Sequence, residues 1–153
     1  MNDTSRARKV YAIERGTVID HIPSPMALKV VQILGVQKQG ILTVGMNFPS
    51  KRLGVKDIVK VENLILSSQA TDRIALVAPT ATINIIEGGQ VVEKRPIHLP
   101  AEFKGLLRCP NPRCISNAEK VTTWFLREGA GADMAVRCVY CERVYQNPAE
   151  LVV

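Results

Sequence analysis

Aromatic residues make up only 5% of this 153-residue sequence, whereas hydrophobic residues as a group make up 46%. The core must therefore be built mainly from aliphatic side chains. No apolar run approaches the ~18–20 residues that span a bilayer, and the polar segment 1–9 has no apolar stretch typical of a secretory signal. These absences predict a soluble, cytoplasmic protein with one full domain or two small ones.

Cysteine is absent from the first 108 residues, and all four cysteines follow. In a reducing compartment such a group indicates a metal site rather than disulfides. Residues 95–100 include two prolines at the point where the composition changes, which predicts a short, stiff connector. We therefore expect two domains, at residues 1–100 and 101–153.

The excess of positive charge lies mostly in the first domain. The net charge is +6. Residues 1–100 have 13 basic and 8 acidic side chains, whereas residues 101–153 have 7 basic and 6 acidic side chains. An anionic partner is thus expected at the first domain. No block of like charge is long enough to act as a nucleic-acid tail.

Periodicity in residues 1–100 predicts alternating strands and helices. Ser24-Pro25 is typical of a helix start, an apolar stripe at helical spacing covers residues 27–34, and Gly35 would end that helix. Ser67-Ser68 would cap a second helix ended by Pro79, and Gly88-Gly89 indicates a hairpin. Strands are expected at 10–13, 41–48, 57–63, 82–87 and 91–95.

This order predicts an α+β fold. Its N-terminal domain is ferredoxin-like, an antiparallel sheet with two helices on one face, and a small all-β zinc domain follows. Such a sheet supports many functions, so the functional prediction has to come from particular residues.

The cysteines form two close pairs, with four residues inside the first pair, two inside the second and twenty-three between them. This spacing favours one tetrahedral zinc site with four thiolates. Four thiolates leave no position for water, so the zinc would be structural. The alternatives are four buried free thiols or two disulfides. The proposed ligands are Cys109, Cys114, Cys138 and Cys141.

Two further features of residues 101–153 bear on function. Arg113 and Arg137 lie next to cysteines, where positive charge would offset a site with a formal charge of −2. The stretch Trp124-Phe125-Leu126 could stack on nucleic-acid bases or pack against protein. The small net charge of this segment favours packing.

Polar residues on the expected strands could hold a nucleotide. Asp20 and His21 end an apolar run, and Lys56, Lys60 and Lys94 recur on strands. Lysine binds phosphate as a point charge, and aspartate accepts hydrogen bonds from sugar hydroxyls. The alternative is that these are solvated charges without a specific partner. The sequence contains no glycine-rich phosphate loop and no nucleophile–base arrangement.

Five stretches of this sequence resemble a known family, the regulatory chain of aspartate carbamoyltransferase. The stretches are 15–23, 54–63, 81–84, 109–116 and 138–142. The resemblance implies a non-catalytic, cytoplasmic subunit of pyrimidine biosynthesis. Its N-terminal domain would bind nucleoside triphosphate effectors of the CTP, ATP and UTP class. Its zinc domain would dock on a separate catalytic chain, and regulatory homodimers would bridge catalytic trimers.

The resemblance also implies roles for individual residues. Those matching positions near the base and ribose are Ala12, Ile13, Asp20, Lys60 and Ile86. Those matching the region around the triphosphate are His21, Asn84, Val91 and Lys94. The four cysteines match the family's zinc ligands.

Three positions depart from the best-known enterobacterial members. Tyr11 replaces an acid and Gly89 replaces an aromatic residue beside the base, which affects base discrimination. Arg113 replaces an asparagine in the loop facing the catalytic chain. Two alternative interpretations are a zinc-ribbon nucleic-acid-binding protein and a small enzyme using His21 and Asp20. The low charge of residues 101–153 and the lack of a catalytic constellation disfavour them.

Overall fold

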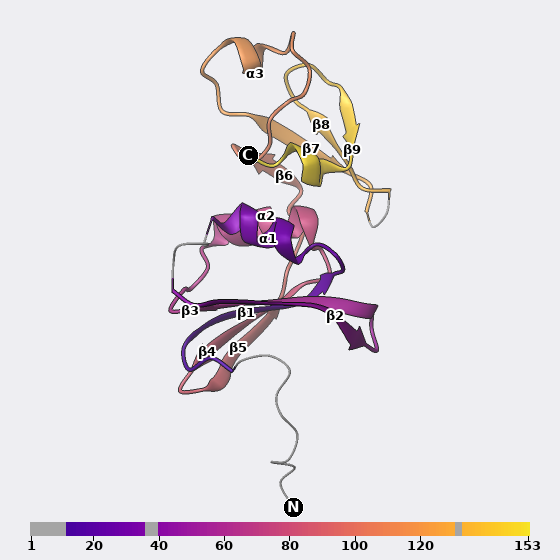
Figure 1. Ribbon diagram of the computed structural model, residues 1–153. Coiled ribbons are helices and arrows are strands. Elements are labelled where there is room, and N and C mark those ends of the chain that lie inside the picture. The colour runs from indigo at the N-terminus through magenta and orange to yellow at the C-terminus, as the bar shows by residue number, and fades with distance from the viewer. Residues whose placement is uncertain (1–11, 36–39, 131–132) are drawn as a thin grey trace, which may run out of the picture.

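The computed structural model describes residues 12–35, 40–130 and 133–153 (Figure 1). The chain forms a five-stranded antiparallel sheet with two helices on one face, followed by a smaller four-stranded antiparallel sheet. The predicted α+β class, with an all-β second part, is therefore confirmed. Within the described ranges, no helix is both long and apolar enough to cross a membrane.

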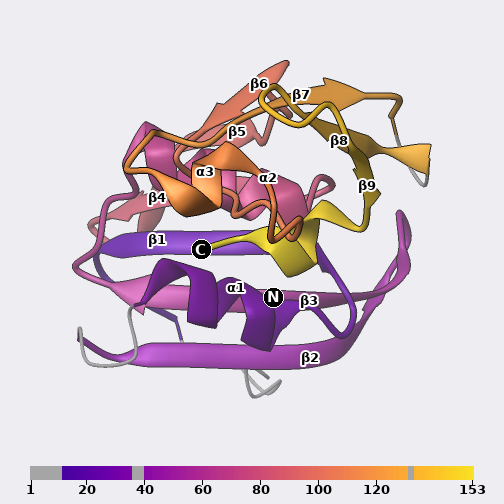
Figure 2. The same ribbon diagram turned by 90° about the horizontal axis from the view of Figure 1, so that it is seen from above.

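The first sheet has the strand order β2-β3-β1-β4-β5, and helices α1 and α2 lie side by side over one of its faces (Figure 2). The split βαβ order expected from the sequence is present, with β5 as the extra hairpin strand. The strands are β1 (Gly16–Pro23), β2 (Leu42–Ser50), β3 (Gly54–Glu62), β4 (Thr82–Glu87) and β5 (Gln90–Pro96). The helices are α1 (Ala27–Leu34) and α2 (Ser68–Val77).

The first strand does not lie where the sequence suggested. It begins at Gly16 rather than at residues 10–13, and Ala12 and Ile13 are not in a strand. Val10, part of the same prediction, lies outside the described residues. Ile13 is only 5% exposed, so its apolar character serves packing rather than strand pairing. Gly16 suits the strand start because a Cβ there would lie 2.2 Å from the Val61 carbonyl oxygen.

The expected cap at Ser24-Pro25 is also wrong. Helix α1 begins at Ala27, and the Ser24 hydroxyl instead donates to the Asn47 side chain. The backbone N–H of Ala27 donates to Asp57 Oδ2 at 3.1 Å, and Asp57 is fully buried on β3. A carboxylate from a distant strand thus satisfies a helix N-terminal donor, which local sequence could not reveal.

Other local predictions are confirmed. Ser67 caps α2 by accepting from the Ala70 N–H at 3.2 Å, and Gly35 ends α1 in the left-handed conformation. Gly88 and Gly89 connect β4 to β5 with φ angles of 59° and 72°, which favour glycine at both turn positions.

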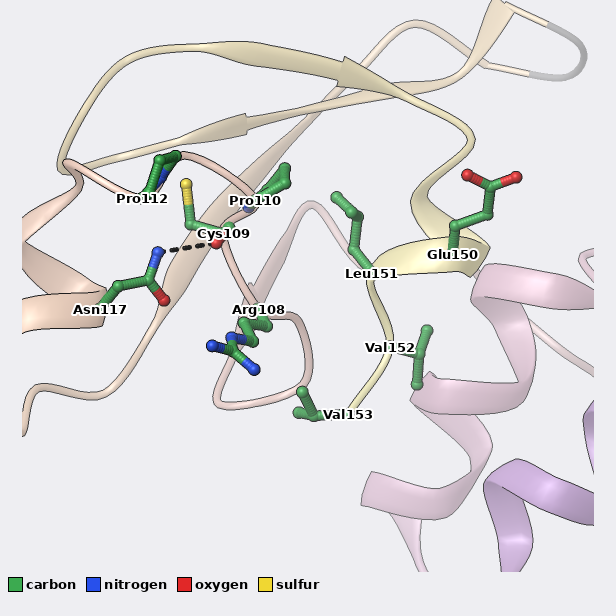
Figure 3. Close-up of a pocket in the computed structure, with 9 residues that line it drawn as sticks. All are labelled: Arg108, Cys109, Pro110, Pro112, Asn117, Glu150, Leu151, Val152 and Val153. Carbon is green, nitrogen blue, oxygen red and sulfur yellow. Dashed lines mark hydrogen bonds between the residues drawn. The ribbon is translucent and has the colours of Figure 1, made fainter.

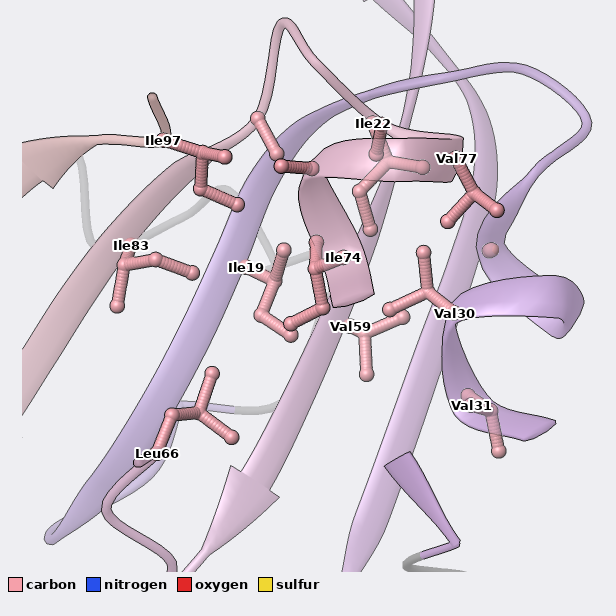
Figure 4. Close-up of a cluster of buried hydrophobic side chains, with 14 of the residues drawn as sticks. Ile19, Ile22, Val30, Val31, Val59, Leu66, Ile74, Val77, Ile83 and Ile97 are labelled. Carbon is pink, nitrogen blue, oxygen red and sulfur yellow. The ribbon is translucent and has the colours of Figure 1, made fainter. Parts of the chain in front are cut away.

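The core between the first sheet and its helices is aliphatic, as the scarcity of aromatic residues predicted (Figure 4). Ile19, Val59 and Ile83 contribute from three adjacent strands, and Val30 and Ile74 contribute from the two helices. All five are fully buried. The opposite face of the sheet therefore remains available for polar side chains.

The second sheet has the order β6-β7-β8-β9 and a separate, smaller core. Phe103 and Phe125 fill this core together with three of the cysteines. Its elements are β6 (Glu102–Lys104), α3 (Ile115–Ala118), β7 (Trp124–Glu128), β8 (Ala135–Cys138), β9 (Val144–Gln146) and the 3-10 helix η2 (Pro148–Leu151).

The two parts touch through a few apolar residues. Leu76 of α2 packs in the core of the second sheet, whereas Ala149 of η2 packs against the core of the first. Leu99, in the proline-containing connector, contacts both cores. The helices α1 and α2 thus lie between the two sheets (Figure 1).

Candidate functional site

The four cysteines converge from two loops that are far apart in sequence. Their sulfur atoms all lie within 4.8 Å of one another. Cys109 Sγ is 3.7 Å from Cys141 Sγ, and Cys114 Sγ is 3.7 Å from Cys138 Sγ. A zinc tetrahedron with Zn–S bonds of ~2.3 Å requires sulfur–sulfur distances of ~3.8 Å, whereas a disulfide needs ~2.05 Å. The donor set and its spacing therefore fit zinc.

The first cysteine loop is held by its own amide side chains. Asn117 Nδ2 donates to the carbonyl oxygens of Cys109 and Asn111, each at 2.8 Å (Figure 3). Asn111 Oδ1 accepts from the Arg113 N–H at 3.1 Å. These bonds hold the turn that carries Cys109 and Cys114, whose sulfur atoms lie close to the same point.

Burial and hydrogen bonding act differently on the individual thiols. Burial raises the pKa of Cys138 to about 12. Burial also raises the pKa of Cys141, but the Arg143 backbone and the Asn111 side chain outweigh it and lower that pKa to about 6. Burial raises the pKa of Tyr145 well above its usual value, and its hydroxyl lies 3.4 Å from Cys109 Sγ.

Of the two arginines expected to offset the charge of the site, Arg113 is exposed and Arg137 has other partners. Arg137 pairs with the Glu128 carboxylate and donates to the Glu142 carbonyl oxygen at 2.8 Å. Neither contact is with a thiol, so backbone N–H groups and the hydroxyls of Ser116 and Tyr145 surround the sulfur atoms instead. Sequence spacing alone did not reveal these two hydroxyls.

The Trp124-Phe125-Leu126 stretch is only partly a surface feature. Phe125 is fully buried in the second core, whereas Leu126 is 39% exposed. Trp124 Nε1 donates to Glu102 at 2.8 Å, and Lys104 Nζ lies 4.5 Å from the Trp124 ring centroid. This packing role agrees with the interpretation that the sequence favoured.

A cavity of about 490 Å³ lies between the first cysteine loop and the C-terminal segment (Figure 3). Arg108 and Glu150 give it charges of both signs, and Leu151 and Val152 add apolar surface. A mixed surface of this kind suits a protein partner better than a nucleic acid.

The uncovered face of the first sheet carries a row of residues across four strands. Val18 on β1 pairs with Lys60 on β3 and with Asn84 on β4, and Asn84 pairs with Lys94 on β5. Directly paired residues point to the same face. With ~4.8 Å between neighbouring strands, the Lys60 and Lys94 positions are ~14 Å apart. The two lysines thus lie at the two ends of the row, with Val18 and Asn84 between them.

A cavity of about 220 Å³ opens on the same face. Six of the nine predicted effector-binding residues line it, together with Gly89, which the resemblance placed beside the base, and Val18, which had no assigned role. Oδ1 of Asn84 is buried and has no hydrogen-bond partner among the described residues, so a ligand donor could satisfy it. The six predicted lining residues are Ala12, Ile13, Lys60, Asn84, Ile86 and Val91.

The remaining three predicted residues lie outside this cavity. Lys94 is next to it through its pairing with Asn84. Asp20 follows Val18 by two residues on the same face and pairs with Lys56 at 3.0 Å. His21 has a φ of 56°, and its Nδ1 lies 3.2 Å from Thr82 Oγ1. Asp20 and His21 thus form a second polar group farther along β1.

The backbone conformation at position 89 favours glycine, one of the residues at which the sequence departs from the enterobacterial pattern. Gly89 has a φ of 72°, and its N–H donates to the Glu14 carbonyl oxygen at 2.9 Å. A Cβ at this position would lie 3.2 Å from the Glu14 carboxylate. Backbone therefore forms the wall of the cavity at Gly89. Tyr11, the other departure, lies outside the described residues.

Comparison with known proteins assigns both parts of the chain to one family. Residues 8–98 match the allosteric domain of the aspartate carbamoyltransferase regulatory chain, and residues 101–149 match its metal-binding domain. A regulatory chain from Pyrococcus horikoshii is 52% identical over 142 residues, which cover 91% of this chain and 93% of the relative. One from Thermofilum pendens is 49% identical over 147 residues, covering 94% and 91%.

Fold, cysteine geometry and both matches thus define a two-part protein with an allosteric domain and a metal-binding domain. The chain belongs to the aspartate carbamoyltransferase regulatory chain family. A four-thiolate structural zinc site is the form of metal site that its cysteines fit.

Proposed function

We propose that this chain is a non-catalytic, cytoplasmic subunit that makes aspartate carbamoyltransferase responsive to nucleotides. Residues 1–100 would bind the effector, and residues 101–153 would dock on the catalytic chain. The observation that carries the proposal is the Lys60–Val18–Asn84–Lys94 row beside a cavity, on a sheet separate from the cysteine cluster.

Different residues in and beside the row would contact different parts of one nucleoside triphosphate of the CTP, ATP or UTP class. The base would enter the cavity beside the backbone of Ala12 and Ile13, with Ile86 against its ring. Lys60 would contact base and ribose, and Lys94 the triphosphate. The ~14 Å between the two lysine positions is of the order of a nucleotide's length from base to phosphate.

The second polar group extends this binding surface. Asp20 would accept from ribose hydroxyls, and His21 would contact phosphate oxygens together with Asn84 and Val91. The Lys56–Asp20 ion pair supports this role because it holds the carboxylate in place before the ligand arrives.

Zinc would be held by Cys109, Cys114, Cys138 and Cys141. Zinc in such a site supplies folding energy and no open coordination position. The metal would therefore fix the shape of the first cysteine loop and of the surface next to it.

The docking surface would include Arg113 in that loop and the cavity beside Arg108 and Glu150. A regulatory homodimer would form through the nucleotide-binding part. The edge strands β2 and β5 support this, because each has one side that pairs with no other strand within the described residues, and β5 exposes Val91 and Val92.

Signal transfer would use unequal effector affinity for two quaternary states, with a coupling free energy of ~1–3 kcal/mol. The apolar joint of Leu76, Leu99 and Ala149 supports such coupling because it links both cores.

The test is reconstitution with catalytic trimers. The chain alone should show no carbamoyl transfer, and adding it should make the aspartate saturation curve depend on nucleotide concentration. The isolated trimer should show no such dependence. Carbamoyl transfer by the chain alone would contradict the proposal. Assembly without a nucleotide response would leave the docking role and contradict the effector role.

A further inference from the structure

A second cationic cavity lies away from the nucleotide-binding face. It has a volume of about 340 Å³ and lies among α1, α2 and the C-terminal residues. Its lining residues are Lys29, Gln32, Ile33, Arg73, Val152 and Val153. Both helices cover the opposite face of the first sheet from the Lys60–Lys94 row (Figure 2), so the two cavities are distinct.

The cations of this cavity face no acidic side chain in the described structure, and the one negative group among the lining residues is the α-carboxylate of Val153. Nε of Arg73 is buried and has no hydrogen-bond partner in residues 12–35, 40–130 and 133–153. A buried guanidinium nitrogen without an acceptor is costly, and such groups usually have a water or an ion as partner. Within those same ranges, Lys29 forms no ion pair with a carboxylate.

The geometry suits a particular class of anion. Arginine offers a planar fork of N–H donors, and lysine offers a point charge, and both bind phosphoryl oxygens. Two cations from two helices exceed the single α-carboxylate of Val153, so the lining has a net positive charge that suits an anion. Gln32 can donate a further hydrogen bond, and Ile33 and Val152 give the cavity an apolar side.

We propose that this cavity binds a small phosphoryl-bearing anion, with Arg73 and Lys29 as its cationic partners. Because Val152 belongs to the segment after the second sheet and the helices belong to the first part, the bound anion contacts both parts of the chain. Occupancy would therefore strengthen the junction between them. The source is either free phosphate or the phosphoryl group of a larger metabolite.

The test is a titration of the zinc-loaded full chain with inorganic phosphate and, separately, with pyrophosphate, followed by amide NMR shifts. Ionic strength is held constant with chloride. Saturable shifts are expected at Lys29, Gln32, Arg73 and Val152. Their positions separate binding here from binding on the sheet face. Tighter binding of pyrophosphate than of phosphate would point to a larger phosphorylated metabolite as the source.

Arg73→Gln should weaken binding by about ten-fold or more, as expected for loss of a charge-assisted contact. If Arg73→Gln does not keep a native NMR spectrum, Lys29→Gln, at a partly exposed position, serves as the second variant. Arg52→Gln, at an exposed turn position, is the matched control and should bind like wild type. Linear, non-saturating shifts with both anions, or equal affinity in wild type and the folded cavity variants, would overturn the proposal.

Discussion

Among the described residues, the core between the first sheet and its helices contains sixteen buried aliphatic residues, whereas that of the second sheet contains ten buried residues, three of them cysteines. The first part can therefore derive its stability from hydrophobic burial. The second part has short strands and little apolar surface to bury, so its stability must depend on metal binding. The difference suggests that the proposed ligand-binding sheet and the proposed docking surface can be stabilised independently within one chain.

Removing the metal should have the largest effect on the difference in stability between the two parts. Structural zinc supplies an apparent binding free energy of ~10–16 kcal/mol in small zinc modules. Cys138→Ser, or treatment with a strong chelator, should unfold residues 101–153 and abolish docking while most of residues 1–100 stay folded. Zinc content, amide NMR spectra and co-sedimentation with catalytic trimers measure these effects. A zinc-free chain with a native second sheet would contradict the role assigned to the metal.

A cavity in the first core should have the converse effect. Ile74 is fully buried against the sheet, so Ile74→Ala should lower the free energy of unfolding of the first part by ~2–5 kcal/mol. Zinc content should stay the same. Leu28→Ala on α1 is the control because Leu28 is 63% exposed. Denaturant unfolding followed by NMR measures both, and equal losses in the two variants would argue against the described core.

The Lys60–Val18–Asn84–Lys94 row can be tested with substitutions that disturb neither core. Lys60→Ala and Lys94→Ala should each weaken nucleotide binding by ~1.5–3 kcal/mol, because each removes a charge-assisted contact. Zinc content and assembly should not change. Lys51→Ala, at an exposed turn position, is the control. Calorimetric titration with CTP and ATP measures the affinities. Unchanged affinity in both variants would mean that the lysines are solvated charges without a ligand.

The smallest expected effect concerns the cap of α2. Ser67→Ala removes the hydroxyl that accepts from the Ala70 N–H and should cost about 1 kcal/mol of stability in the first part. Ser68→Ala, one residue further on, is the matched control and should cost less. If thermal unfolding shows equal shifts for both variants, the assigned cap is wrong.

Sequence reasoning succeeded where the signal was local. The cysteine spacing, the Ser67 cap and the Gly88-Gly89 turn each depend on a few neighbouring residues, and the structure contains all three features. The strand at Thr82–Glu87 was predicted with its correct bounds. These features could be predicted because their physical cause lies within one short segment.

Features that depend on tertiary pairing could not be predicted from local patterns. Burial makes Ile13 resemble a strand residue, although it packs outside the sheet. Asp57 caps α1 from thirty residues away. The alignment of Lys60, Val18 and Asn84 depends on strand register, which local sequence patterns do not specify. The resemblance to a known family, rather than periodicity, identified most residues of the cavity.

The central claim, that the two parts perform separable tasks, is tested most directly by nucleotide binding to the metal-free chain. The affinity for CTP or ATP should agree with that of the zinc-loaded chain within about two-fold, as expected for sites that share no partners. Docking on catalytic trimers should be lost in the same sample. Loss of nucleotide binding together with zinc, while residues 1–100 keep their native NMR spectrum, would contradict the claim.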